Sequence, residues 1–312
     1  MNQIKAGTHA KSLKQRIWRE RWAYILLVPV VLFFLIFHYF PMYGVQLAFK
    51  DFAIRKGISG SSWVGLKHFR VLFRSMIFWQ SVRNTLLISL YKLIFGFPAS
   101  VIFALMINEL RTKTFRNTVQ TISYLPHFLS WVILGSIVHD VLSINGVVNY
   151  IIEFFGGTKI QFLTEPKCFR AILVITGMWK EVGWGSIIYL AAITGISTDL
   201  YEAAAIDGAS RLKIICRIIL PLLASVMSIQ FILQLGNILS AGFDQVFNLY
   251  NSLVYSTGDI IDTYVYRVGM TDKLQYSLST AVGLFKNVIG FALVVTSNAI
   301  IRRMGDGGNG IW

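Results

Sequence analysis

Paired charged and aromatic residues lie together inside one apolar stretch of the chain, from about residue 169 to 196. They are Trp179, Lys180, Glu181 and Trp184. Aromatic rings can lie under the C–H faces of a sugar, while charged groups bind its hydroxyls. Ionisable groups inside a bilayer are costly, so they usually face a cavity or a partner. Because adjacent residues on a helix do not face each other, at least one of Lys180 and Glu181 is expected to face the interior.

Three amide side chains in a later apolar stretch, from about 218 to 243, extend this pattern. They are Gln230, Gln234 and Asn237, at near-helical spacing. These residues and the group above are predicted to line a substrate pathway. Interhelical hydrogen bonds and subunit packing explain each of them about as well.

A segment between these two stretches is too rich in alanine to be an ordinary polar loop. Asp199 and Glu202 fit a capping box at a helix start, and Ala203, Ala204 and Ala205 follow. Alanine is the best helix former and leaves a surface of low relief. A short, smooth helix is therefore predicted here.

Gly208 supplies the left-handed position that ends this short helix. Ser210 can cap a second helix that leads through Pro221 into the next apolar stretch. Such an elbow, rigidly joined to a transmembrane helix, is suited to transmit the motion of a cytoplasmic motor. The alternative is an amphipathic re-entrant loop without a motor.

The sequence contains none of the usual patterns for catalysis or cofactor binding. No G-x-x-x-x-G-K-[ST] is present to hold ATP phosphates, and no H-E-x-x-H to hold zinc. The five histidines are scattered, and Cys168 and Cys216 fall on opposite faces of the predicted membrane domain. We therefore predict no catalytic, cofactor or metal site and no enzymatic activity in this chain.

The elements that hold these residues are predicted to be transmembrane helices. The chain has 312 residues, of which 55% are hydrophobic and 14% charged, and its mean hydropathy is +0.60. Six stretches are long enough to cross about 30 Å of hydrocarbon, which needs ~20 residues. They lack the period-2 alternation of barrel strands, so an all-α bundle is predicted. The six are 22–49, 84–108, 117–139, 169–196, 218–243 and 277–301.

The net charge of +14 is attributed to anchoring at an anionic leaflet, and no nucleic-acid partner is expected. The basic segment 1–21 places the N-terminus in the cytoplasm, and six crossings return the C-terminus there. The predicted parts are the interfacial segment 1–21, a six-helix transmembrane domain 22–304 and a cytoplasmic tail 305–312. The domain includes an outer segment, 41–83, and an inner loop, 199–217.

Two outer regions leave alternatives open. Apolar residues at helical spacing between Leu66 and Met76 predict a helix, lying flat on the membrane or packed on the bundle as a cap. The acids of segment 243–276 form either a solvated surface or a docking face for an external partner. These acids are Asp244, Asp259, Asp262 and Asp272.

Lysines at membrane depth outnumber the one deep carboxylate, Glu181. They are Lys92, Lys180 and Lys286. This surplus suggests that the pathway tolerates an anionic glycan. Lysines that snorkel to the membrane surface are the alternative.

The alanine-rich segment resembles a known signature, E-A-A-x3-G-x9-I-x-L-P. The matching residues are Glu202, Ala203, Ala204, Gly208, Ile218, Leu220 and Pro221. This spacing is similar to the EAA loop of binding-protein-dependent ABC importers of the type I fold, and Asp207-Gly208-Ala209 resembles their carbohydrate branch. The blocks 37–44, 49–52, 63–69 and 179–184 resemble LplB-like permeases, which are annotated for polysaccharide or complex-oligosaccharide uptake.

The resemblance implies a type I ABC importer transmembrane domain in the bacterial cytoplasmic membrane. The coupling residues would be Glu202, Ala203, Ala204, Asp207, Gly208 and Ala209. Implied partners are a second homologous permease, two ATP-binding cassette subunits that hold ATP and Mg, an extracellular substrate-binding lipoprotein and an oligosaccharide. The alternatives are another solute class or an ion-coupled secondary transporter, which would need more membrane carboxylates than Glu181.

Overall fold

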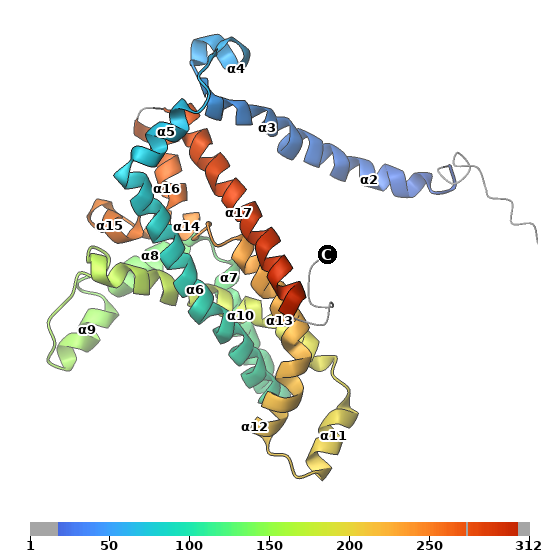
Figure 1. Cartoon of the computed structure of the whole chain (residues 1–312). Coiled ribbons are helices and arrows are strands. Elements are labelled where there is room, and N and C mark those ends of the chain that lie inside the picture. The colour runs from blue at the N-terminus through green and yellow to red at the C-terminus, as the bar shows by residue number, and fades with distance from the viewer. Residues whose placement is uncertain (1–17, 273, 305–312) are drawn as a thin grey trace, which may run out of the picture.

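The computed structural model of the chain describes residues 18–272 and 274–304, which are almost entirely helical (Figure 1). The predicted all-α fold is confirmed. The predictions for the tail 305–312 and for most of the basic segment 1–21 lie outside the described residues. So do the side chains of Arg302 and Arg303 near the C-terminus.

Six helical runs among the described residues are long and apolar enough to cross a membrane, the predicted number. The first run comprises α2 (Arg21–Phe34), η1 (Leu35–Tyr39), α3 (Phe40–Met42) and η2 (Tyr43–Phe49). The others are α6 (Met76–Glu109), α8 (Trp131–Leu142) with α9 (Val147–Phe154), α10 (Pro166–Thr194), α12 (Arg211–Ile214) with η4 (Ile215–Ile219) and α13 (Leu220–Gly236), and most of α17 (Tyr276–Met304).

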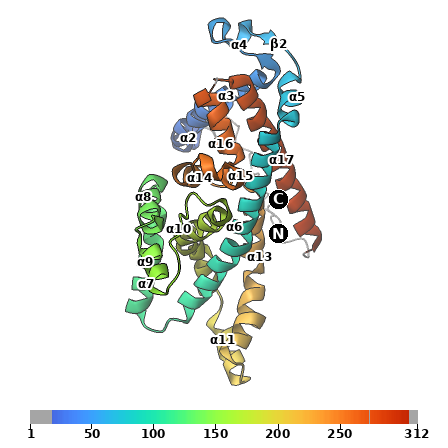
Figure 2. The ribbon, with the colours of Figure 1, turned by 90° about the vertical axis from the view of Figure 1, so that its left-hand side faces the viewer.

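Short elements connect these runs and lie mainly at the two ends of the bundle. They are β1 (Lys50–Asp51), η3 (Ile54–Lys56), α4 (Gly57–Gly60), β2 (Ser62–Trp63), α5 (Lys67–Arg74), α7 (Lys113–Phe128), α11 (Thr198–Ile206), α14 (Phe243–Leu249), η5 (Ser252–Val254), α15 (Tyr255–Gly258), α16 (Ile261–Tyr266) and η6 (Arg267–Asp272). The strands β1 and β2 pair antiparallel. Figures 1 and 2 place α4 at one end of the molecule and α11 at the opposite end.

The third apolar stretch, 117–139, is not the single helix that the sequence predicts. It divides into α7 and α8, because Leu129 and Ser130 have extended backbones. The Ser130 hydroxyl then caps α8 by accepting a hydrogen bond from the Ile133 N–H at 3.4 Å. Pro126, near the end of α7, lacks an amide hydrogen and favours an interruption of the helix.

The fifth apolar stretch also ends earlier than expected. The helix α13 ends at Gly236, so residues 237–242 form an irregular segment before α14. Gly242 has a φ of +94°, and a Cβ there would lie 3.0 Å from the Lys92 amine. The interrupted backbone therefore approaches a charged side chain, an arrangement that membrane proteins tolerate where protein covers the backbone.

The outer segment 41–83 packs on the bundle as a cap, the second of the two alternatives. Leu72 of α5 is fully buried in an apolar cluster with Phe78 of α6 and Val282 of α17. Ser277 connects the segment to α17, because its hydroxyl donates to the Lys50 carbonyl at 2.6 Å. The predicted helix at 66–76 is present in shortened form, as α5.

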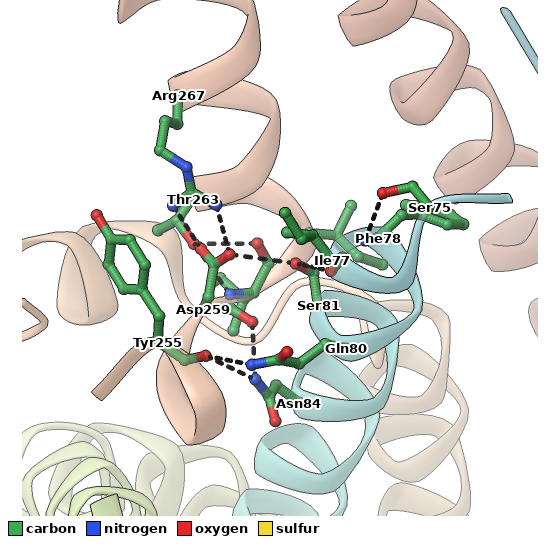
Figure 3. A network of polar contacts seen from close by, with 12 residues as sticks. Ser75, Ile77, Phe78, Gln80, Ser81, Asn84, Tyr255, Asp259, Thr263 and Arg267 are labelled. Atoms are coloured by element: carbon green, nitrogen blue, oxygen red, sulfur yellow. Dashed lines mark hydrogen bonds and ion pairs between the residues drawn. The ribbon is translucent and has the colours of Figure 1, made fainter. Parts of the chain in front are cut away.

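Two of the four acids in segment 243–276 are not part of a solvated surface. Asp259 is 2% exposed and accepts two hydrogen bonds from Arg267, at 2.7 and 3.1 Å (Figure 3). Asp262 pairs with Lys286 of α17 at 2.6 Å. The first alternative is therefore wrong for both residues, whose ion-pair partners lie 8 and 24 positions further along the chain. Asp244 is exposed, and the side chain of Asp272 lies outside the described residues.

Three apolar clusters stabilise the bundle, and two of its helices approach each other closely at a glycine. The clusters centre on Phe169 and Leu249, on Phe78 and Ile261, and on Tyr189 and Leu223. Where α10 meets α7, a Cβ added to Gly183 would lie 2.2 Å from the Ser123 carbonyl oxygen. Only glycine permits this approach without a shift of the backbone.

Gly183→Ala is expected to lower the free energy of unfolding by about 1–3 kcal/mol, because an overpacked helix contact must open. Gly283→Ala in α17 is the matched control, since its added Cβ meets nothing within 4 Å. Thermal melting in detergent micelles measures both. Equal melting temperatures for Gly183→Ala and the wild type would contradict the close contact.

Candidate coupling loop and substrate cavity

The residue that caps α11, Ser197, lies two positions before the predicted capping residue, Asp199. Ser197 has a non-helical backbone, and its hydroxyl accepts a hydrogen bond from the Asp199 N–H at 3.3 Å. The predicted capping box of Asp199 and Glu202 is therefore wrong. Asp199 instead lies in the first turn, where its negative charge favours the positive end of the helix.

The turn after α11 has the predicted left-handed glycine. Gly208 has a φ of +69°, and its N–H donates to the Ala205 carbonyl at 3.1 Å. The Ala209 N–H donates to the Ala204 carbonyl at 2.9 Å, which satisfies another free carbonyl at the helix end. Ser210 precedes α12 as predicted, but its side chain forms no capping hydrogen bond there.

This coupling loop, residues 197–217, is fixed at its base and exposed at its tip. Tyr201 packs against the cluster that contains Leu223, and Arg211 pairs with Glu109 at the end of α6 at 2.8 Å. Burial and the nearby Glu109 carboxylate raise the pKa of Tyr201. By contrast, Ile206 is 86% exposed, and no residue of α11 is buried.

The exposed tip carries an apolar surface that the sequence analysis did not single out. Besides Ile206 it includes Leu212, and Glu202 and Ala203 are exposed beside them. The position of Ile206 after the three alanines was the available signal. A small, partly apolar projection at one end of the molecule is suited to fit a cleft of another protein.

At the other candidate site, Lys180 is buried and holds the break between α7 and α8. Its amine donates to three backbone carbonyls, those of Pro126, His127 and Leu129, at 3.2, 2.8 and 2.6 Å. The Pro126 carbonyl also accepts from the Leu129 N–H at 3.2 Å, whereas the His127 and Leu129 carbonyls lie past the last helical hydrogen bond of α7. Lys180 is thus committed to the protein backbone and does not line the cavity described next.

Glu181 and Trp184 contact His127 beside this break. The Glu181 carboxylate lies 3.0 Å from His127 Nδ1, and the rings of His127 and Trp184 stack with centroids 4.4 Å apart. The interruption of the third apolar stretch thus brings His127 to the fourth. His127 had been set aside because it has no ligand spacing to other histidines.

Glu181, Trp184 and Gln234 line one cavity of about 390 Å³ between α6, α10 and α13. Its other polar walls include three residues that the pathway prediction left out, Lys92, Ser100 and Gln245. Gln230 and Asn237 line a second cavity of about 360 Å³, which shares Lys92 and Gln234 with the first. The two cavities are therefore neighbours, and together they contain five of the seven predicted pathway residues.

Trp179 lies on another face of α10. It borders an entirely apolar pocket with Ile137 and Val141 of α8. A helix that presents Glu181 and Trp184 to the polar cavity turns Trp179 away from it. Trp179 and Lys180 are the two predicted pathway residues that the structure does not bring to the cavity.

The charge surplus is smaller than the sequence suggests. Lys286 is paired with Asp262, and Lys180 is held by carbonyls. Lys92 donates to the Ala241 carbonyl at 2.6 Å and to Gln245, yet it borders both cavities. Of the three lysines, Lys92 alone faces the polar space, opposite Glu181. No group of three or more metal-ligating side chains occurs in the part of the chain that the structure describes.

Comparison with known proteins identifies the family to which this chain belongs. The family model of the binding-protein-dependent transport system inner membrane component matches residues 96–306, which include the candidate coupling loop and most of the residues that line the two cavities. The chain belongs to this family. It is a multi-pass membrane permease, a translocation subunit of an ABC transporter.

Two relatives in Bacillus subtilis match the permease over most of its length, and one of them is named for polysaccharide transport. "Protein LplB" of Bacillus subtilis is 43% identical, and the match covers 93% of this chain and 91% of that protein. The "polygalacturonan/rhamnogalacturonan transport system permease protein YteP" of the same organism is 42% identical, with coverage of 96% and 93%. The resemblance to LplB-like carbohydrate permeases is thus confirmed.

Two solved structures share the permease fold. One is a bacterial ABC transporter involved in import of the acidic polysaccharide alginate, with a TM-score of 0.86, 42% identity and coverage of 93% of this chain and 98% of that chain. The other is a bacterial alginate ABC transporter in complex with an alginate pentasaccharide-bound periplasmic protein. Its TM-score is 0.87, with 41% identity and coverage of 96% and 99%.

Proposed function

We propose that this permease imports oligosaccharides or complex glycans, as one half of the translocation pathway of an ATP-driven importer. The observation that carries the proposal is the coupling loop, which has the seven signature residues and is anchored at its base and exposed at its tip. Its exposed tip would fit a cleft of an ATP-binding cassette subunit. Two such subunits would hold ATP and Mg, because this chain has no phosphate-binding loop.

The proposed orientation places α11 in the cytoplasm and the cap 41–83 outside the cell. Both termini would then be cytoplasmic, and the cap would face an extracellular substrate-binding lipoprotein. The basic residues of segment 1–21 support this orientation, because positive charge collects on the cytoplasmic side of membrane proteins.

A second, homologous permease would complete the pathway. The exposure of α2 supports this partnership, since no residue from Arg21 to Phe34 is buried and the helix projects from the bundle (Figure 1). The two polar cavities also lie beside α6, the first against α10 and α13 and the second against α13 and the segment that follows it. A facing subunit would enclose them.

A glycan is the proposed substrate because the cavity combines Trp184 with amides and charged groups, and because the relatives are named for sugars. ATP binding would close the motor dimer and move the two coupling loops together. The permease pair would then open outward and receive sugar from the binding protein. Hydrolysis of ATP would reset it.

Purification of the permease from native membranes tests this proposal. We expect a stoichiometric ATP-binding cassette partner, and uptake that stops when ATP is depleted at a maintained proton gradient. Uptake driven by a proton gradient in liposomes that contain this chain alone would instead support a secondary transporter and overturn the proposal.

A further inference from the structure

A groove of about 480 Å³ runs between α6 and α10, separate from the two polar cavities. We call it the outer groove, because it begins at the end of α10 that lies away from α11. Its walls are Tyr91, Phe95, Lys167, Arg170, Ala171, Val174, Ile175 and Met178. Met178 also lines the cavity that contains Glu181 and Trp184. The outer groove and that cavity are therefore neighbours along α10.

The position of the outer groove along α10 explains why its walls can include charged side chains. Lys167 and Arg170 lie in the first two turns of α10, a helix of 29 residues. Such a helix is about 43 Å long at 1.5 Å per residue, so its first turns lie near a membrane surface. Cations at this depth are reached by water and by charged solutes.

Arg170 is held in a fixed direction. One nitrogen donates to the Asn84 side chain at 2.8 Å, and another to the Thr257 carbonyl at 3.3 Å. Asn84 is itself fully buried and donates to the Asp259 carbonyl at 3.1 Å, within the network of Figure 3. Arginine has five N–H donors, and within the described residues Arg170 uses two. The remaining donors suit a planar carboxylate.

The charges around Arg170 are mostly positive. Lys167 is exposed one turn away, and its amine has no ion pair in the described parts of the chain. Arg83 of α6 is close enough to repel Arg170 electrostatically. The nearby carboxylate is that of Glu165, which caps α10 by accepting from the Lys167 backbone N–H at 3.3 Å. The three cations therefore outnumber Glu165, whose carboxylate caps the start of α10.

The opposite wall of the outer groove is aromatic. Tyr91 and Phe95 are exposed and lie one helical turn apart on α6. Aromatic rings combine a large apolar face with little conformational freedom. The α10 wall has two cations near the start of the helix and four apolar residues beyond them, and the α6 wall adds two rings. This combination matches a ligand that has both apolar C–H faces and negative charges, which is the chemistry of a uronate-bearing oligosaccharide.

We propose that the outer groove is the first binding site of this permease for an acidic oligosaccharide. Lys167 and Arg170 bind its carboxylates, and Tyr91 and Phe95 contact its sugar rings. The chain then passes Met178 into the cavity of Glu181 and Trp184. This inference rests on the proposed function and adds to it a substrate class and a site.

Uptake of a tetragalacturonate and of its fully methyl-esterified form tests the proposal, because the two differ in charge and share length and linkage. Cells carrying the complete importer are compared with Lys167→Gln, which removes a charge without breaking a hydrogen bond. Lys159→Gln is the matched control, since Lys159 pairs with Glu153 at 3.4 Å away from the groove. We expect Lys167→Gln to lower the initial uptake rate of the acidic oligomer about tenfold, and Lys159→Gln to leave it unchanged.

Arg170 requires a second comparison, since it also bonds to Asn84. Arg170→Gln is expected to lower acidic uptake at least as much as Lys167→Gln, and Arg170→Lys to restore part of it. Unchanged acidic uptake in Lys167→Gln, or an equal loss for both oligomers, overturns the proposal. The second result would assign the cations to folding or to lipid anchoring.

Uptake by the wild-type importer distinguishes a failure of the acidic site from a failure of the proposed function. Import of the esterified oligomer with exclusion of the acidic one would overturn the acidic site and leave the glycan permease standing. If the wild type imports neither these oligomers nor any other oligosaccharide, the proposed function itself fails.

Discussion

Gly208→Val is expected to reduce ATP-driven uptake on the order of 100-fold, the upper range of coupling between two protein sites. Gly208 has a φ of +69° at the end of α11. A β-branched residue resists that backbone angle, so the turn would rearrange and the tip of the coupling loop would lose its position. The expected defect is in transmission of force, with the transmembrane bundle intact.

Gly156→Val is the matched control for this prediction. Gly156 lies after α9, outside the coupling loop and the cap; it has a φ of +79°, and an added Cβ meets nothing within 4 Å at either glycine. Both glycines end a helix with the same pattern of backbone hydrogen bonds, so both variants carry the same kind of local strain. Uptake is measured with labelled oligosaccharide, and the amount of permease in the membrane by immunoblot. Equal uptake by the two variants at equal abundance would contradict the coupling role of the loop.

Lys180→Met is expected to destabilise the permease by about 3–5 kcal/mol, because it removes one side of a buried, charge-assisted contact. The Lys180 amine donates to the Pro126, His127 and Leu129 carbonyls, and methionine has similar length but no donor. The His127 and Leu129 carbonyls at the break between α7 and α8 would then lose this donor in a region poor in water, while the Pro126 carbonyl would keep the Leu129 N–H.

Thermal unfolding in detergent micelles, followed by tryptophan fluorescence, measures this effect. The melting temperature should fall by roughly 10 °C. Lys67→Met serves as control, because Lys67 forms an exposed pair with Asp51 that contributes about 0–1 kcal/mol. If Lys180→Met melts at the temperature of Lys67→Met, the amine does not stabilise the break.

The number of spans and the left-handed turn were predictable because both are local. The length of an apolar run decides whether a helix can cross a bilayer, and Gly208 is the residue type that ends a helix in that conformation. The start of α11 was placed two residues late, since Ser197 and Asp199 are both good capping residues and the sequence alone does not rank them.

The features that were missed depend on contacts between distant residues. Asp259 and Asp262 look like surface acids in sequence, but Arg267 is joined to Asp259 across α16, and the packing of α16 against α17 brings Lys286 to Asp262. Pro126 does not by itself distinguish a kinked helix from a divided one. Lys180, 54 positions from Pro126, supplies the donors that stabilise the division.

The residues of the candidate substrate cavity could also be predicted only in part. Lys92 was noticed as a lysine in an apolar stretch, but its place beside Gln234 and Gln245 follows from the irregular backbone after α13. Trp179 and Lys180 were assigned to the pathway with Glu181 and Trp184, and the turn of α10 separates them. The residue types suggested a substrate pathway, but the rotation of α10 about its axis determines which of these side chains line the cavity.

The central claim is that the exposed tip of α11 engages an ATP-binding subunit. A photo-crosslinking amino acid in place of Ile206, which is 86% exposed, tests this directly in living cells. The account predicts one crosslinked product, identified by mass spectrometry as a chain with an ATP-binding cassette, whose yield changes when ATP is depleted. Labelling of position 206 by a membrane-impermeant reagent added outside intact cells, with no such product, would contradict it.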